Sequence, residues 1–119
     1  MNKDNLILNL SMDFAVKTVK LSGQLKEFPK DIIAKQLIRS GTSIGANIWE
    51  SQGAESRNDF IHKLKISAKE AEETNYWLEL CKRLEYIDNH EELLNDLVAI
   101  KKVLSKIIST SKSKKLSAN

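Results

Sequence analysis

Histidine and carboxylate side chains are the groups of this chain that could hold a metal, and their spacing argues against it. The two histidines are His62 and His90. A carboxylate-bridged di-iron bundle needs a Glu-x-x-His motif on each of two helices. Asp59-x-x-His62 is a single poor match, and no acid lies three positions before His90. The zinc-protease motif also fails, because Leu94 stands where His90-Glu91 would need a second histidine. We predict no metal site and no cofactor.

The single cysteine, Cys81, lies between Leu80 and Leu84. A lone cysteine among leucines is typical of a small buried hydrophobe and not of a nucleophile. One cysteine forms no intramolecular disulfide, which fits a reducing compartment. No apolar run approaches the ~20 residues of a membrane span, and the chain begins without a signal-peptide pattern. We therefore expect a cytoplasmic protein that is not an enzyme, has no catalytic residues and has no membrane partner.

Six further polar residues fall on or beside apolar helical positions: Asn47, Glu50, Arg57, Glu70, Glu73 and Asn75. A carboxylate removed from water is costly without a partner, and Arg57 is a candidate partner for these acids. Two interpretations follow: a polar clamp that fixes the register of neighbouring helices, or a paired-carboxylate active site. We favour the clamp, because no nucleophile or metal ligand converges with these residues.

Lysines concentrate at the C-terminal end of the chain. Residues 61–100 contain five basic and nine acidic residues, whereas residues 101–119 contain no acid. A net charge of +3 is too small to indicate nucleic-acid binding by itself. A basic end after an acidic segment is either an arm that contacts nucleic acid or a solvated polar end. The candidate nucleic-acid-binding residues are Lys101, Lys102, Lys106, Lys112, Lys114 and Lys115.

Helices must position all of these side chains. The 119 residues are 41% hydrophobic and 29% charged, which fits one soluble globular domain. Four glycines and one proline are too few for a loop-rich or all-β fold. Apolar residues recur at helical spacing in four segments, about residues 5–27, 30–51, 56–85 and 90–111. We predict an all-α fold, an antiparallel up-down-up-down four-helix bundle over residues 1–111. A polar basic tail that frays is expected over residues 112–119.

Two glycines, Gly41 and Gly45, fall inside the second predicted helix. Each costs about 1 kcal/mol relative to alanine, so a close approach of another helix should offset that cost. The alternative is a phosphate or small-molecule contact at a glycine-lined surface. The strand–loop–helix setting of a phosphate loop is missing, and we therefore predict a tight helix–helix contact.

The fourth predicted helix is apolar over about half of its circumference, more than the ~100° stripe that one bundle buries. This excess predicts a second partner surface and hence a homo-oligomer. Lys101, Lys102 and Lys106 fall on the remaining face. Three aromatic residues, Trp49, Tyr76 and Trp77, could stack on single-stranded bases or anchor a protein interface, and we favour the interface.

Four sequence features occur in colinear order over most of the chain. They are Phe28-Pro29, the run from Gln36-Leu37-x-Arg39 to Ser43-Ile44-x-x-Asn47-Ile48-x-Glu50, Ser56-Arg57-x-Asp59-Phe60-Ile61, and Glu73 and Leu78 before Leu84-x-Tyr86-Ile87. With these features the chain resembles the bacterial four-helix-bundle proteins named after intervening sequences in 23S ribosomal RNA genes, also labelled S23 ribosomal proteins. It departs from them at Trp49-Glu50-Ser51, where Ala-Glu-Gly is usual, and at Lys69-Glu70, where Gly-Ser is common.

The resemblance implies a cytoplasmic, ring-like homo-oligomer such as a pentamer, without known catalysis. The family is similar to the accessory variability determinant of diversity-generating retroelements, a basic bundle that binds nucleic acid and a reverse transcriptase. Two function classes stay open at this point. One is a nucleic-acid or ribonucleoprotein accessory protein that contacts RNA or DNA phosphates through the lysines. The other is a structural interaction module for an unidentified protein partner.

Overall fold

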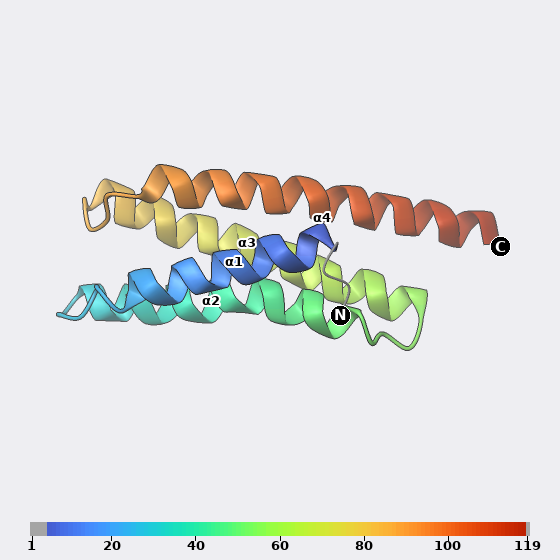
Figure 1. Ribbon diagram of the computed structural model, residues 1–119, viewed down its shortest axis with the longest axis horizontal. Coiled ribbons are helices and arrows are strands. Elements are labelled where there is room, and N and C mark those ends of the chain that lie inside the picture. Colours follow the sequence, from blue (N-terminus) through green and yellow to red (C-terminus); the bar gives the residue numbers. More distant parts are fainter. Residues whose placement is uncertain (1–4, 119) are drawn as a thin grey trace.

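The computed structural model describes residues 5–118, which form four α-helices joined by short connections (Figure 1). They are α1 (Leu6–Ser22), α2 (Lys30–Ser51), α3 (Arg57–Arg83) and α4 (His90–Ala118). Each helix packs antiparallel against the next in sequence, and α1 also packs against α4. The bundle is 53 Å long and 23 Å across. The predicted fold class, an antiparallel four-helix bundle, is confirmed.

The core is a continuous column of aliphatic side chains with Phe14 among them. Its most buried members have at most 1% of their surface exposed: Phe14, Leu37, Ile44, Ile48, Leu64, Leu78, Leu93, Leu97, Ile100 and Leu104. Buried hydroxyl groups accompany them, and the Ser67 hydroxyl donates to the Ile44 carbonyl at 2.8 Å. Because such groups are hydrogen-bonded, small polar residues let α2 and α3 approach closely without the penalty of an unsatisfied donor.

The first helix is shorter than predicted. It ends at Ser22 instead of near residue 27, and Gly23 is its C-cap. Glycine is a poor helix former, and two contacts turn the chain at this point: Leu25 is buried, and the Ser22 hydroxyl donates to the Ala34 carbonyl of α2 at 3.3 Å. Pro29 is the N-cap residue of α2.

The fourth helix is longer than predicted. It does not end at Ser111 but continues to Ala118. Ser111 is buried against the bundle, and the residues after it include no glycine or proline that would stop a helix. Lys112 and Lys114 are therefore carried on a helix, while the side chain of Lys115 lies outside the described residues.

The end of α3 predicts a stabilising substitution. Glu85 follows the C-cap residue Leu84 and has a positive φ of 58°. The Tyr86 N–H donates to the Cys81 carbonyl at 2.9 Å, as in a Schellman motif. A side chain in this left-handed conformation costs roughly 1–2 kcal/mol, which glycine avoids. We expect Glu85→Gly to raise the free energy of unfolding by about 1 kcal/mol in urea titrations. An unchanged or lower value would contradict this reading of the turn.

Candidate nucleic-acid interface

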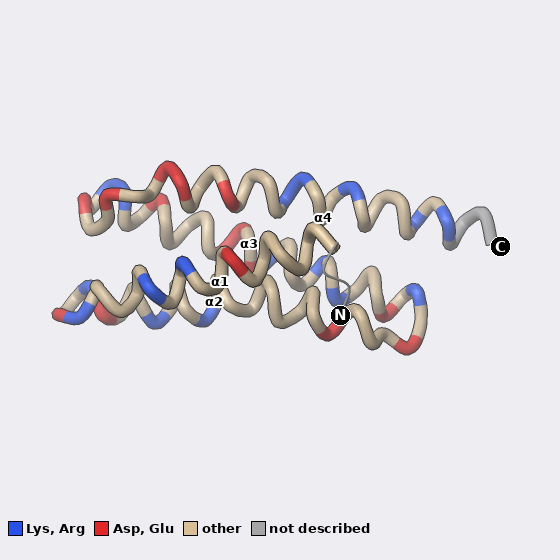
Figure 2. The backbone as a smooth tube through the Cα atoms, viewed as in Figure 1, with Lys and Arg blue, Asp and Glu red and all other residues tan. Residues whose placement is uncertain are grey.

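The C-terminal lysines whose side chains the structure describes do not share one face of α4; they are Lys101, Lys102, Lys106, Lys112 and Lys114. Lys101 and Lys112 lie only about 20° apart around α4, on the flank toward α3, whereas Lys106 is about 140° away from Lys101. Lys106 and Lys114 line a separate groove with Arg57. Lys102 is exposed. Figure 2 shows that basic residues occupy the C-terminal half of α4 and acidic residues its N-terminal half.

A groove between α3 and α4 brings one subset of these lysines together with lysines of α3. Its volume is about 530 Å³, and its lining is Ala68, Lys69, Glu72, Lys101, Ser105, Ile108, Ser109 and Lys112. Glu72 is the carboxylate in this lining, and the Lys101 ammonium pairs with it at 2.9 Å. Lys69 and Lys112 form no ion pair with any residue that the structure describes. The groove therefore carries an excess of positive charge.

Lys65 of α3 adds a further positive charge near Lys112, which is one of the residues that line this groove. The neighbouring Lys112 ammonium lowers the pKa of Lys65, because two like charges lie close together. Lys69 contributes to the same effect. We name Lys65, Lys69, Lys101 and Lys112 the α3–α4 lysine cluster.

The lysines of α3 were missed by sequence analysis. Lys65 and Lys69 stand four residues apart and so lie on one face of their helix. That spacing is visible in the sequence, but residues 61–100 contain more acidic than basic residues, so this segment did not stand out as a candidate for binding phosphates. Only the register between α3 and α4 shows that these two residues lie opposite Lys112.

The residues 5–118 that the structure describes contain no metal-binding cluster. No group of three or more His, Cys, Asp or Glu side chains in this range could hold a metal ion. His62 near the start of α3 and His90 at the start of α4 lie at opposite ends of the bundle. Cys81 is fully buried, and burial raises the pKa of its thiol. Across residues 5–118, every helix falls short of the uninterrupted apolar length that a bilayer crossing requires.

A protein family and a solved structure both match this chain. A sequence model of the 23S rRNA-intervening sequence protein family matches residues 3–106. The chain belongs to this family. A solved structure from Bacteroides thetaiotaomicron, described as a protein with unknown function from the S23 ribosomal protein family, has 50% identity and a TM-score of 0.80. The match covers 86% of this chain and 97% of that chain. No curated protein matches. Lys112 and Lys114 lie beyond the residues that the family model matches.

Residues in the family motifs join α2 to α3 through ion pairs. Arg39 pairs with Glu70 at 3.3 Å and with Glu73. The Trp77 indole N–H donates to the second of these carboxylates at 3.0 Å. Lys63 pairs with Glu50 at 2.9 Å. These pairs form an inter-helix clamp between α2 and α3.

The predicted partner of these acids was wrong. Arg57 pairs with neither Glu50 nor Glu73, because it lies at the first position of α3 and lines the groove with Lys106. Arg39, the residue that takes the role, stands in the quoted family run. Asn47 does not bridge helices, since its amide donates to the Ser43 carbonyl of its own helix at 2.8 Å.

Both helix-interior glycines of this family member face α1. A Cβ atom on Gly41 would lie 2.7 Å from the Thr18 Cγ2 atom, closer than carbon atoms can pack. A Cβ atom on Gly45 would lie 3.4 Å from the Ser11 carbonyl oxygen and hydroxyl oxygen, an ordinary contact. The glycines therefore allow α1 to pack closely on α2, and the need for a residue without a side chain is stricter at Gly41 than at Gly45.

Exposed apolar side chains of this family member gather on α1 and α2. Met12, Val16 and Val19 on α1 and Ile38 and Trp49 on α2 are each between 39% and 52% exposed, and we name them the α1–α2 apolar stripe. Met12 and Trp49 also line one groove together with Gly45 and Ala46. The wide apolar arc of α4 is mostly covered, although its Val98 is 48% exposed.

A second ion-pair clamp joins α1 to α4. The Lys17 ammonium lies 2.8 Å from the Asp96 carboxylate and 2.9 Å from the Glu92 carboxylate. Hydrogen bonds to Asp96 and then to Glu92 raise the pKa of Lys17. The clamp sets which turns of α1 and α4 lie side by side.

Proposed function

We propose that this protein is a non-catalytic accessory protein that binds the phosphate backbone of nucleic acid through the α3–α4 lysine cluster. The observation that carries the proposal is the α3–α4 groove, in which Lys69, Lys101 and Lys112 line one space and Glu72 is the carboxylate among the lining residues. Phosphate groups bind where several ammonium groups gather with few carboxylates to neutralise them. The one cysteine, Cys81, is a free buried thiol, and free thiols are typical of reducing compartments, which supports the cytoplasm as the location of this activity.

The composition of the α3–α4 groove favours contacts to phosphates over contacts to bases. Its lining holds ammonium groups and the hydroxyls of Ser105 and Ser109, but no aromatic ring and no amide side chain. Ammonium groups act as point charges on phosphate, and hydroxyls can donate to phosphate oxygens. Base recognition requires stacking or paired hydrogen bonds. We therefore propose binding that tolerates any sequence, on either RNA or DNA.

A salt titration tests this function. The logarithm of the binding constant of the full-length protein for a fluorescent duplex RNA and a duplex DNA should fall linearly with the logarithm of salt concentration. With two to four phosphates neutralised, the slope is expected to be roughly −2 to −4. Fluorescence anisotropy over a range of KCl concentrations measures it. No binding at low ionic strength, or binding that salt leaves unchanged, would remove the nucleic-acid proposal.

The α1–α2 apolar stripe favours a second candidate function, a protein–protein interaction module, and we propose a second copy of this chain as its first partner. Apolar side chains at helical spacing on two neighbouring helices are typical of a surface that another protein covers. A cyclic ring, such as a pentamer, would repeat the α3–α4 lysine cluster once per subunit and add weak phosphate contacts together.

The assembly predicts a result in light scattering. We expect the wild type at micromolar concentration to exceed the 13.5 kDa of one chain several-fold. Met12→Glu with Trp49→Glu should give a folded monomer, because charges on the stripe oppose its burial. Val98→Glu, on the exposed part of α4, is the matched control and should leave the assembly unchanged. A wild type whose mass by light scattering equals that of one chain would contradict this proposal.

A further inference from the structure

A second groove lies on the other flank of α4, beyond the start of α1. The Lys17–Asp96 pair sets the register of these antiparallel helices, so Leu6 at the start of α1 lies close to the level of Lys106. From there α4 continues for about three turns without α1 beside it. Figure 1 shows α4 reaching well past the start of α1. The space is lined by Arg57, Phe60, Lys106, Ile107, Thr110, Ser111 and Lys114 and has a volume of about 680 Å³. We name it the α1-end groove.

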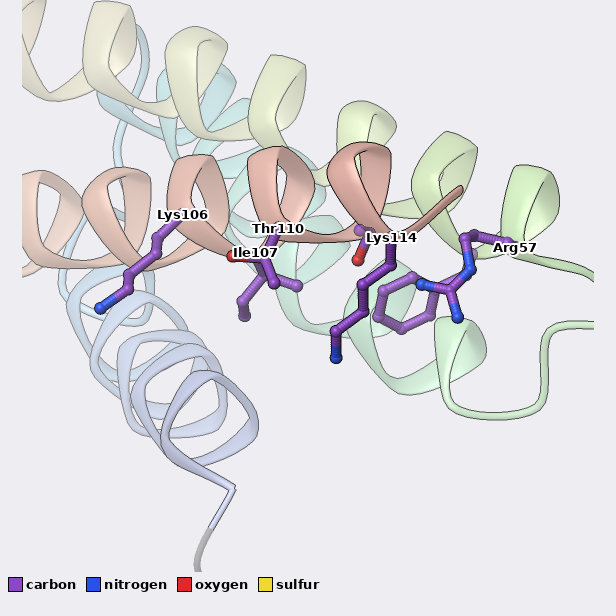
Figure 3. Close-up of a pocket in the computed structure, with 7 residues that line it drawn as sticks. Arg57, Lys106, Ile107, Thr110 and Lys114 are labelled. Carbon is purple, nitrogen blue, oxygen red and sulfur yellow. The ribbon is translucent and has the colours of Figure 1, made fainter. Parts of the chain in front are cut away.

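The floor of the α1-end groove is apolar and its rim is cationic. Phe60 and Ile107 are half-buried in the floor, while Arg57, Lys106 and Lys114 are exposed around it. Figure 3 shows Lys106, Ile107, Thr110 and Lys114 following one another along α4, with Arg57 approaching from α3 at the far end. None of the three cations forms an ion pair with another residue that the structure describes, and the lining holds no carboxylate.

We propose that the α1-end groove is a docking site for an acidic amphipathic helix of a partner protein. The groove runs along α4 beyond the start of α1 (Figure 1), with Arg57 and Phe60 of α3 on its other side, so a helix lying along α3 and α4 fits its shape. Phe60 and Ile107 match an apolar helix face. The three cations at the rim match carboxylates on the flanks of that helix. A phosphate backbone would satisfy the cations but leave the apolar floor in water, and this favours a peptide over nucleic acid.

A designed peptide tests this docking site on the full-length protein. The probe is a fluorescein-labelled helical peptide of about five turns, with Leu on one face, Glu on both flanks and Ala elsewhere. A scrambled peptide of the same composition is the control. Anisotropy titrations are expected to show at least about tenfold tighter binding of the designed peptide. Equal binding of the two peptides would overturn the proposal, because charge alone would then explain the interaction.

Two variants separate charge from shape. Lys106→Glu with Lys114→Glu should lower affinity for the designed peptide at least about tenfold. Lys20→Glu with Lys35→Glu is the matched control and should leave that affinity unchanged. Thr110→Trp keeps every charge but fills the groove with an indole, so it should also lower peptide affinity while duplex RNA affinity persists. Circular dichroism confirms that each variant is folded.

The outcomes also distinguish this site from the proposed phosphate site. If Lys106→Glu with Lys114→Glu lowers affinity for duplex RNA as much as for the peptide, the α1-end groove is part of a nucleic-acid surface and the docking proposal is wrong. If Thr110→Trp leaves peptide affinity unchanged, the peptide binds elsewhere and the proposal is again wrong. Failure of RNA binding in the wild type leaves this test unaffected.

Discussion

Reversing the charges of Lys65, Lys69 and Lys112 together is expected to lower the affinity for duplex RNA and DNA by about two orders of magnitude or more at low salt. Each substitution removes a cation of the α3–α4 lysine cluster and places a carboxylate where a phosphate would bind. Lys101 is left intact, because its pair with Glu72 at 2.9 Å joins α3 to α4. Anisotropy titrations against salt should also give a slope closer to zero, since fewer counterions are released.

The matched control carries the same change in net charge at the other end of the molecule. Lys20, Lys26 and Lys35 are exposed residues in or near α1 and α2, and they form no ion pair among the residues that the structure describes. Their replacement by Glu should lower affinity only slightly, through long-range electrostatics that salt screens. If both triple variants lose affinity equally, binding depends on net charge and the cluster is not the site.

Replacing Gly41 by leucine is expected to lower the free energy of unfolding by about 3 kcal/mol. Thr18 is buried, and its hydroxyl donates to the Phe14 carbonyl at 2.8 Å, so it cannot move aside freely. A Cβ atom on Gly41 already meets Thr18 at 2.7 Å, and the rest of the leucine side chain would force α1 away from α2. Urea denaturation followed by circular dichroism measures the loss.

A double-mutant cycle shows whether Thr18 is the cause. Gly41→Ala should destabilise despite the better helix propensity of alanine, and Thr18→Ala in the same chain should remove most of that penalty. Gly45→Ala is the control and should change the free energy of unfolding by less than about 1 kcal/mol, because the nearest atoms lie 3.4 Å away. A fully tolerated Gly41→Leu would show that the α1–α2 contact is looser than the structure has it.

Helix number and type could be predicted from the sequence because each helix buries one continuous apolar face. Leu37, Ile44 and Ile48 recur at helical spacing, and all three are fully buried. The start of α3 also depends on residues that are close in the sequence, because the side-chain oxygen of its N-cap residue Ser56 accepts a hydrogen bond from the Asp59 N–H at 3.0 Å. Helix ends that depend on tertiary contacts were harder to predict. Burial of Leu25 ended α1 early, and burial of Ser111 accompanied the longer α4.

Pairing between helices could not be predicted in the same way. Sequence spacing places Glu73 on one side of its helix but does not say which residue of α2 lies opposite. Core packing fixes that register, and it brings Arg39 to Glu73 while leaving Arg57 at the bundle end. The same register brings Lys65 of α3 to Lys112 of α4. The candidate site was therefore predicted only in part, on α4, and its α3 half came from the structure.

The antiparallel packing of each helix on its neighbours in sequence bears on how the chain folds. Contacts between successive helices close short loops, which keeps the topological barrier low and favours folding in milliseconds or faster. The packing of α1 on α4 joins the most distant segments and loses more chain entropy on closure. We expect the Lys17 clamp to Glu92 and Asp96 to form after the folding transition state, so its loss should speed unfolding and leave the folding rate almost unchanged.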